Sequence, residues 1–172
     1  MTVEPTRERT YAWGDPMLSA GELRTSAGID VLRGMAEGRL PGAPIAATLG
    51  MGLESVEPGR VVFTLEPAEF HYNPIGSVHG GVYATILDSA TGCAVHSLLP
   101  AGVGYTSLDL TVKFLRAMTT RTGTARCTGT VTHLGGRTAL AEARLVDADD
   151  RLLATATSSI LVIRPEPGAA VG

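Results

Sequence analysis

The stretch His71-Tyr-Asn-Pro-Ile-Gly-Ser-Val-His-Gly-Gly-Val-Tyr-Ala-Thr-Ile-Leu-Asp-Ser-Ala90 decides the fold, because a turn-rich loop passes directly into a long apolar helix within it. The loop half contains Asn73 and Gly76, both typical of turns. The helix is predicted over Val78–Leu99, a stretch without a proline. Apolar residues occupy most of its circumference, which is typical of a buried helix, and Pro100 ends it.

The segments on both sides of this helix alternate as β-strands do. Two strands, Leu49–Glu57 and Arg60–Glu66, are predicted before it, with a turn at Pro58-Gly59. Four strands with one apolar and one polar face are predicted after it: Tyr105–Arg116, Arg121–His133, Thr138–Val146 and Leu152–Ile163. The chain is therefore expected to be an α+β protein, in which an antiparallel β-sheet wraps around one long central α-helix.

The first 44 residues have a different composition from the rest, with irregularly spaced prolines and glycines. We predict an N-terminal arm over residues 1–44, with one short helix that begins at Ile29 and places Leu32 and Met35 on one face. Residues 45–164 are predicted to form the main domain. Residues 165–172 have no core pattern and are predicted to be a flexible tail.

Composition excludes several classes of protein. A chain of 172 residues with 44% hydrophobic residues can form one domain with a real core, unlike a disordered chain. Its 14 basic residues face 17 acidic ones without a basic run, so no nucleic-acid partner is expected. No stretch approaches the roughly 20 apolar residues of a membrane helix, and no secretory signal is recognisable, so we expect a cytoplasmic protein without a membrane partner.

The cysteines and histidines do not indicate a metal site. Cys93 and Cys127 provide neither a disulfide framework nor a metal cluster, and we expect both to be small buried residues. The four histidines lack metal-ligand spacing, so no metal is expected.

Two features of the decisive stretch point to chemistry. Gly80 and Gly81 open the helix, where free backbone N–H groups at the positive end of the dipole can hold an anion or an oxyanion. The alternative is a loop that only needs glycine torsions. Asp88 lies in the most apolar part of the helix, where an unpaired carboxylate costs several kcal/mol, so a functional role is favoured over a solvent-facing one.

Eight residues separate Gly80 from Asp88, which corresponds to about 12 Å along a helix. One small acyl carbon cannot contact both groups in the same chain. If both are catalytic, the active site must be shared between two subunits.

The pattern His-x-Asn-x-x-Gly-x-x-His-Gly-Gly over residues 71–81, followed by Leu87-Asp88-Ser89, resembles the hotdog-fold acyl-CoA thioesterases of the phenylacetate-degradation type. The resemblance covers about residues 45–163. It implies that Asn73 and Gly80 polarise the thioester carbonyl, and that Asp88 of the neighbouring subunit is the nucleophile or the general base. It also implies a water-positioning hydroxyl on the next strand, either Ser107 or, with the register shifted by one, Thr106.

The same resemblance implies an acyl-CoA substrate and no separate cofactor, since CoA is part of the substrate. It implies a homodimer, or a homotetramer built as a dimer of dimers. His79 is either a helix cap or a substrate contact. The other residues expected to bind substrate, by backbone N–H groups or by charge on the CoA phosphates, are Gly81, Lys113, Arg116, Gly136 and Arg137.

Two alternatives stay open at this point. A hydratase or dehydratase on the same fold normally relies on a histidine paired with a carboxylate, but His79 lies nine residues before Asp88. A non-catalytic acyl-CoA-binding module has the same fold without turnover. The sequence does not distinguish an aromatic acyl group from a short or medium aliphatic one.

Overall fold

The computed structural model describes residues 6–165. Three short helices come first: α1 (Pro16–Glu22), α2 (Gly28–Ala36) and α3 (Pro44–Leu49). The hairpin of β1 (Met51–Glu57) and β2 (Arg60–Leu65), a 3₁₀ turn η1 (Glu69–His71) and the long helix α4 (Gly80–His96) follow. Five further strands complete the chain: β3 (Gly104–Ser107), β4 (Thr111–Phe114), β5 (Ala125–Leu134), β6 (Thr138–Val146) and β7 (Leu152–Ile163).

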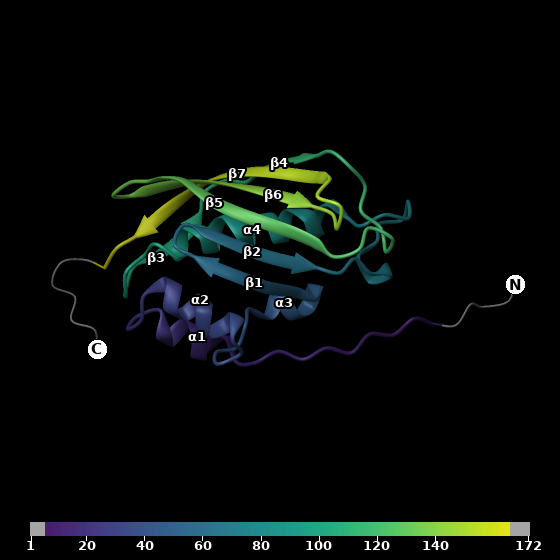
Figure 1. Cartoon of the computed structure of the whole chain (residues 1–172). Helices are drawn as coiled ribbons and strands as arrows, with labels where there is room; N and C mark the ends of the chain where they lie inside the picture. The colour runs from purple at the N-terminus through teal and green to yellow at the C-terminus, as the bar shows by residue number, and fades with distance from the viewer. Residues whose placement is uncertain (1–5, 166–172) are drawn as a thin grey trace, which may run out of the picture.

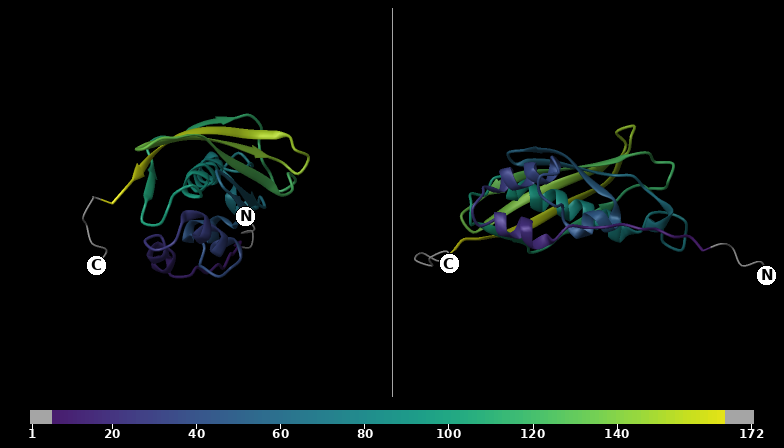
Figure 2. Two further views of the ribbon diagram at one scale, coloured as in Figure 1. Left: turned by 60° about the vertical axis from the view of Figure 1, so that its left-hand side comes forward. Right: turned by 90° about the horizontal axis from the view of Figure 1, so that it is seen from below.

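The strands form one antiparallel sheet that curves around α4. Their order is β1-β2-β5-β6-β7-β3, and β4 also pairs with β7, beside β3 at the same edge. Figure 1 shows α4 behind the sheet, and Figure 2 shows the sheet curling over it. The predicted architecture, an antiparallel sheet wrapped around one long helix, is confirmed.

The core lies between α4 and the concave face of the sheet. Ile86, Leu87 and Ala90 of α4 are completely buried, as their apolar pattern predicts. Gly129 on β5 lets the helix backbone approach the sheet, because a Cβ there would lie 2.1 Å from the Ala90 carbonyl oxygen. The helix backbone therefore packs directly against β5 at this point.

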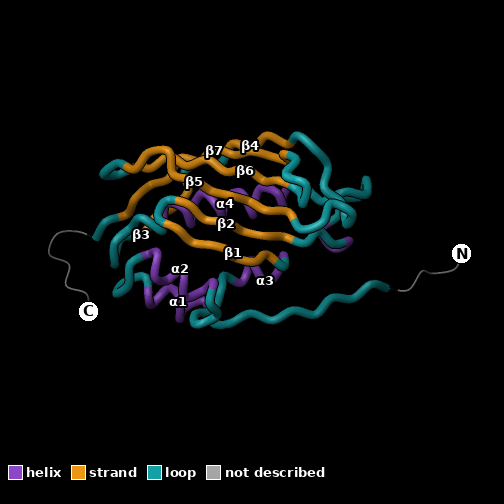
Figure 3. Tube along the Cα trace, viewed as in Figure 1, coloured by secondary structure: helices purple, strands orange, loops and turns teal. Residues whose placement is uncertain are grey.

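The N-terminal segment is more ordered than predicted. The predicted short helix corresponds to α2, but α1 and α3 were expected to be irregular because each contains a proline. Pro16 and Pro44 lie in the first turns of these helices, where the missing N–H would have no partner in any case. Figure 3 shows the three helices below the sheet, with the preceding segment extended beneath α3.

The domain boundaries stay predictions. Helix α3 crosses the predicted boundary between residues 44 and 45. Of the predicted tail, residues 166–172 lie outside the described residues. Within the described part, no helix is long and apolar enough to cross a membrane.

The prediction of one continuous strand over Tyr105–Arg116 is wrong, because β3 and β4 are separated by a break. Asp109 causes the break: its Oδ1 accepts a hydrogen bond from Ser159 N (3.0 Å) and its carbonyl oxygen accepts one from Ser158 Oγ (2.8 Å). The apolar face predicted for this strand is only partly buried, since Leu110 and Val112 pack against the core, whereas Leu108 is 57% exposed and Phe114 is 56% exposed. This edge of the sheet therefore presents apolar side chains.

Candidate active site

The loop before α4 is anchored by a buried histidine. His71 is 3% exposed; its Nε2 lies 2.8 Å from the Leu49 carbonyl oxygen, and its Nδ1 accepts a hydrogen bond from Ala68 N (3.0 Å). Burial lowers the pKa of His71, which keeps the ring neutral at neutral pH. The first histidine of the motif thus fixes the loop to the end of α3.

Asn73 holds the turn that leads into α4. Its Oδ1 accepts hydrogen bonds from Ile75 N (3.0 Å) and Ser77 N (3.3 Å), and its Nδ2 donates to Ser77 Oγ (3.3 Å). An amide nitrogen carries two hydrogens. One therefore stays available for a substrate carbonyl while the oxygen is used by the loop.

The first turn of α4 presents one free backbone donor. His79 caps the helix, since its Nδ1 accepts a hydrogen bond from Gly81 N (2.9 Å), and this occupies the Gly81 N–H. The Gly80 N–H has no hydrogen-bond partner among residues 6–165. Gly80 borders a shallow cavity of about 300 Å³, and a Cβ at this position would lie 3.2 Å from Phe114 Cζ. This N–H is a candidate oxyanion donor at the positive end of the helix dipole.

Asp88 lies in a different and larger cavity, of about 580 Å³. The half-buried carboxylate accepts a hydrogen bond from Ser107 Oγ on β3, at 2.8 Å from Oδ1. The two side chains that the motif singles out on α4 and on the next strand are thus in contact. Their common surroundings are mainly apolar, with side chains such as Leu53 and Phe63 in the lining.

The sequence did not predict that Tyr105 also lines this cavity. Gly92 makes room for its ring, because a Cβ there would lie 2.9 Å from Tyr105 Cε2. The Tyr105 hydroxyl bonds to the Cys93 thiol, while burial raises the pKa of Cys93 to about 12. A raised pKa keeps the thiol neutral, and a neutral thiol is a poor nucleophile. A glycine inside an apolar helix was the available signal for this close approach.

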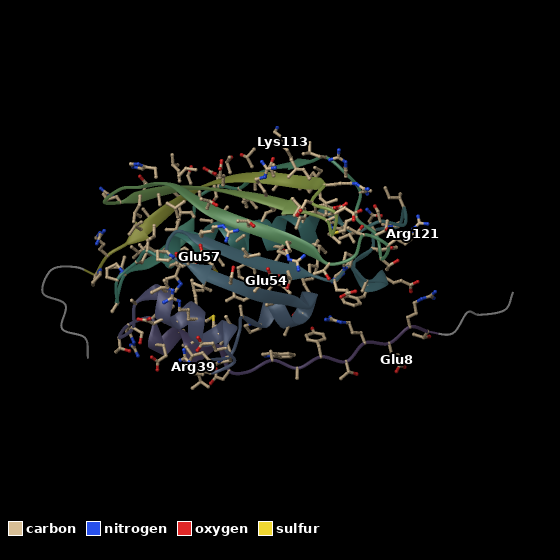
Figure 4. All side chains as sticks on the ribbon, in the orientation of Figure 1. Glu8, Arg39, Glu54, Glu57, Lys113 and Arg121 are labelled. Carbon is tan, nitrogen blue, oxygen red and sulfur yellow. The ribbon has the colours of Figure 1, made fainter. Side chains whose placement is uncertain are left out.

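The two predicted basic residues at β4 differ in their relation to the cavity of Gly80. Lys113 stands at the edge of the sheet and points away from it (Figure 4). Arg116 lines the cavity that Gly80 borders, and its guanidinium donates a hydrogen bond to the Leu152 carbonyl oxygen at 2.5 Å. Arg116 thus shares a cavity with the first turn of α4, whereas Lys113 is not among the residues that line it.

Gly136 and Arg137 lie elsewhere, in the turn between β5 and β6. The Arg137 carbonyl oxygen accepts a hydrogen bond from Val162 N, whereas Lys113 pairs with Thr155 on the same strand. Seven residues of β7 separate these two positions, which corresponds to about 23 Å. One chain therefore does not bring all the predicted substrate-binding residues together. Gly136 and Arg137 form a group of their own, far from Lys113.

The residues around Asp88 also bear on metal and histidine chemistry. Within residues 6–165, no group of three His, Cys, Asp or Glu side chains could hold a metal ion. No histidine is among the described residues that line the cavity of Asp88. The side chains that line this cavity thus offer a carboxylate, two serine hydroxyls, a thiol and a phenol.

The chain matches the model of the thioesterase superfamily over residues 75–154. It is 28% identical over 116 residues to the 1,4-dihydroxy-2-naphthoyl-CoA hydrolase of Listeria monocytogenes, covering 67% of this chain and 92% of the relative. It is 30% identical over 129 residues to a candidate esterase of Halobacterium salinarum, covering 69% of this chain and 83% of the relative.

A solved structure agrees with these relatives. It is a phenylacetic acid degradation-related protein of Ralstonia eutropha, with a TM-score of 0.69 and 27% identity, covering 76% of this chain and 98% of that one. The family segment over residues 75–154 includes Gly80, Asp88 and Ser107 but begins after Asn73. Helices α1, α2 and α3 also lie outside it.

Proposed function

Since the chain belongs to the thioesterase superfamily and has its hotdog fold, we propose that it hydrolyses acyl-CoA thioesters to a free acid and CoA. Thioester hydrolysis in general follows from the family. The observation that carries the finer proposal is the Asp88 carboxylate, which is held by Ser107 at 2.8 Å beside a largely apolar cavity. A carboxylate in such a place can act on a carbonyl whose acyl group occupies the cavity.

Each group then has a role in the reaction. The Gly80 N–H and the Asn73 amide polarise the thioester carbonyl and stabilise the oxyanion that develops on it. Asp88 either attacks the carbonyl carbon itself or removes a proton from the attacking water. In the first route, the C–S bond breaks as the carboxylate displaces the CoA thiolate, and water then hydrolyses the resulting anhydride to the free acid and gives a proton to the thiolate. In the second route, the water oxygen bonds to the carbonyl carbon, the C–S bond breaks, and the CoA thiolate takes up the proton. Ser107 donates to one carboxylate oxygen and leaves the other free for this work.

The proposed site needs two chains. Gly80 and Asp88 line separate cavities, and about 12 Å of helix lies between them. We therefore propose a homodimer in which Gly80 and Asn73 of one subunit face Asp88 of the other, with a dimer of dimers as the next assembly. The edge formed by β3 and β4 favours sheet-to-sheet pairing, since it exposes Leu108, Phe114 and Leu115.

The relatives support an acyl-CoA substrate. The Listeria monocytogenes relative is named as a hydrolase of an aromatic CoA ester. A hydratase is less favoured, because no histidine among the described residues shares the cavity of Asp88.

A panel of CoA esters tests the activity. Benzoyl-CoA, phenylacetyl-CoA and hexanoyl-CoA are incubated with the protein in the presence of a thiol-detecting dye. Release of free thiol supports hydrolysis. Water addition to an enoyl-CoA would instead indicate a hydratase, and binding without turnover would indicate an acyl-CoA-binding module.

Mixing two inactive variants tests the shared site. Asn73→Ala and Asp88→Asn proteins are allowed to exchange subunits, which gives mixed dimers with one intact site and one doubly altered site. About a quarter of the wild-type activity is expected when exchange is complete and random. An absence of rescue with proven exchange, or an active monomer by light scattering, would contradict the shared site.

A further inference from the structure

The cavity of Asp88 is closed on one side by the N-terminal helices. Figure 2 shows these helices on the side of α4 that faces away from the sheet. Leu32 and Met35 of α2 line the cavity, as do Ile45 and Ala46 of α3. All four precede residue 75, where the matched family segment begins. This wall therefore lies outside the matched segment, as do β1 and β2.

The other side of the cavity belongs to the hotdog domain. Met51 and Leu53 of β1 and Phe63 of β2 face the N-terminal wall, whereas Asp88 and Ser107 contribute carboxylate and hydroxyl groups. Apolar side chains thus line the space on both sides, beside a reactive carboxylate. This arrangement suits an acyl group that enters the cavity with its thioester next to Asp88.

Helix α2 is a fixed part of the wall. Its first residue, Gly28, donates its N–H to the Leu99 carbonyl oxygen (3.0 Å). A Cβ at Gly28 would lie 2.0 Å from the His96 carbonyl oxygen, so α2 lies directly against the last turn of α4. Leu32 is 2% exposed and belongs to the main core. A larger side chain on the face of α2 that lines the cavity is therefore expected to reduce the volume of the cavity.

Helix α3 is also held in place. The Arg9 guanidinium donates hydrogen bonds to the carbonyl oxygens of Ala47 (3.0 Å) and Thr48 (2.5 Å), at the end of α3. The chain before α3 is tied to α1, because Ser19 Oγ donates to the Pro41 carbonyl oxygen at 2.7 Å. Both helices of the wall are thus anchored by contacts that do not involve the cavity.

The volume of the cavity indicates the size of its occupant. An apolar protein cavity of about 150 Å³ is enough to bind one benzene molecule. The cavity of Asp88 has about 580 Å³, which leaves room for a larger group in addition to the reacting thioester. Two thioethers, from Met35 and Met51, and the phenyl ring of Phe63 are among its lining groups. Thioethers contact aromatic rings favourably, which favours a flat aryl group over an alkyl chain.

We propose that α2 and α3 determine the acyl specificity of this protein, and that the wall they form selects a flat hydrophobic acyl group larger than a single benzene ring. This proposal rests on the proposed thioesterase function. Met35 is the principal selecting residue, because it projects from the anchored helix α2 into the cavity lining.

The test compares acetyl-CoA, benzoyl-CoA and 2-naphthoyl-CoA as substrates of the full chain. Wild type is expected to show the highest kcat/KM for 2-naphthoyl-CoA. Met35→Trp narrows the cavity and is expected to lower kcat/KM for 2-naphthoyl-CoA at least tenfold, while the value for acetyl-CoA stays within twofold. The matched control is Arg33→Trp, which adds the same side chain at an exposed position of the same helix. It is expected to leave all three values within twofold.

A second narrowing variant covers the case in which Met35→Trp folds poorly. Ala46→Phe narrows the cavity from α3 and is expected to show the same selective loss. Equal losses for all three esters in the well-folded variant, or no loss for 2-naphthoyl-CoA, would overturn the proposal. A wild type that prefers acetyl-CoA would overturn it as well.

Binding distinguishes this proposal from the proposed function. Calorimetry with the Asp88→Asn protein measures the Kd of 2-naphthoyl-CoA and of free CoA without turnover. Adding Met35→Trp is expected to raise the Kd of 2-naphthoyl-CoA at least tenfold and to leave the Kd of free CoA unchanged. If wild type releases thiol from no ester, the proposed activity fails, and the binding result still decides whether the wall selects the acyl group. Equal Kd values of 2-naphthoyl-CoA for Asp88→Asn and for the double variant would contradict the proposal that the wall selects the acyl group.

Discussion

Along α4, the first turn borders a shallow cavity of about 300 Å³ beside the loop of Asn73, whereas the segment around Asp88 borders an apolar cavity of about 580 Å³. The histidines at the two ends of the helix differ in the same way. His79 is exposed and caps the first turn, whereas His96 is 6% exposed and packs against Tyr105. One helix thus has an exposed histidine at its first turn and a buried one at its last.

This difference bears on the proposal that the active site is shared between two subunits. The first turn offers hydrogen-bond donors for a carbonyl but no carboxylate, whereas the interior offers a carboxylate beside an apolar cavity. An oxyanion donor works through a fixed N–H and tolerates some exposure, whereas an acyl group needs apolar burial. The division of labour along α4 therefore favours the shared site proposed above.

The largest expected effect concerns the interior region. Asp88→Asn keeps the shape of the side chain and removes its charge and its basic oxygen, so kcat is expected to fall by about 10² to 10⁴. The melting temperature should stay the same or rise, because a half-buried charge is removed. Steady-state kinetics and thermal unfolding are measured together. Asp30→Asn, on the exposed face of α2, is the matched control and should leave both unchanged.

Near-normal kcat in well-folded Asp88→Asn protein would contradict the mechanism. The hotdog fold and the family would be unaffected by that result. The proposal that the two regions of α4 supply the donors and the base of one shared site would then fail.

The next effect concerns the polar end. Asn73→Asp retains an oxygen for the N–H groups of Ile75 and Ser77 but replaces the amide donor with a negatively charged oxygen. Loss of one carbonyl donor is expected to lower kcat by about 10² to 10³. Asn73→Ala removes the turn contacts as well, so it should lower the melting temperature more than Asn73→Asp does. If kcat changes only in proportion to stability, Asn73 serves the loop alone.

Sequence periodicity predicted the elements whose burial is regular. The strands Thr138–Val146 and Leu152–Ile163 match β6 and β7, because small and apolar side chains alternate along them with few interruptions. The break between β3 and β4 was not predictable, because it depends on a contact between Asp109 and β7 that lies about 50 residues further along the chain. The helices α1 and α3 were missed because proline at a helix start looks the same as proline in a loop.

The site was predictable to the extent that it lies in one contiguous motif. Asp88 and Ser107 were named together and are in contact, and their catalytic roles stay predictions. The cavity wall was not predictable, because Met35 and Tyr105 reach the same space from segments that are 70 residues apart. No local sequence pattern indicates that two such distant segments line the same cavity.

Because His96 is buried at the end of α4, the stability of the protein is expected to depend on pH. Burial lowers the pKa of His96 to about 4 from 6.5, so the unfolded chain binds the proton more strongly than the folded one. The contribution of neutral His96 to the free energy of unfolding is therefore fully present above pH 6.5 and is lost as the pH falls towards 4. A shift of this size corresponds to about 3 kcal/mol.

Unfolding in denaturant at several pH values between 4 and 7 measures this effect. Wild type should lose more stability over this range than His96→Leu, which cannot titrate at this position. His71 also has a pKa lowered mainly by burial and contributes in the same direction, so some pH dependence should remain in the variant. Parallel curves for the two proteins would show that His96 is not buried in its neutral form.

The smallest effect concerns the exposed cap and separates its two candidate roles. His79 accepts the Gly81 N–H at 2.9 Å, so His79→Ala should destabilise the helix start by about 1 kcal/mol. His79→Asn supplies another side-chain acceptor at this position and should recover most of that loss. If His79 only caps α4, kcat/KM stays within a few-fold of wild type in both variants, because the Gly80 N–H is still available. If the ring contacts the substrate instead, kcat/KM falls in both variants although His79→Asn is as stable as wild type. The divergence of stability from activity in His79→Asn therefore decides whether the first turn of α4 binds substrate through its backbone alone.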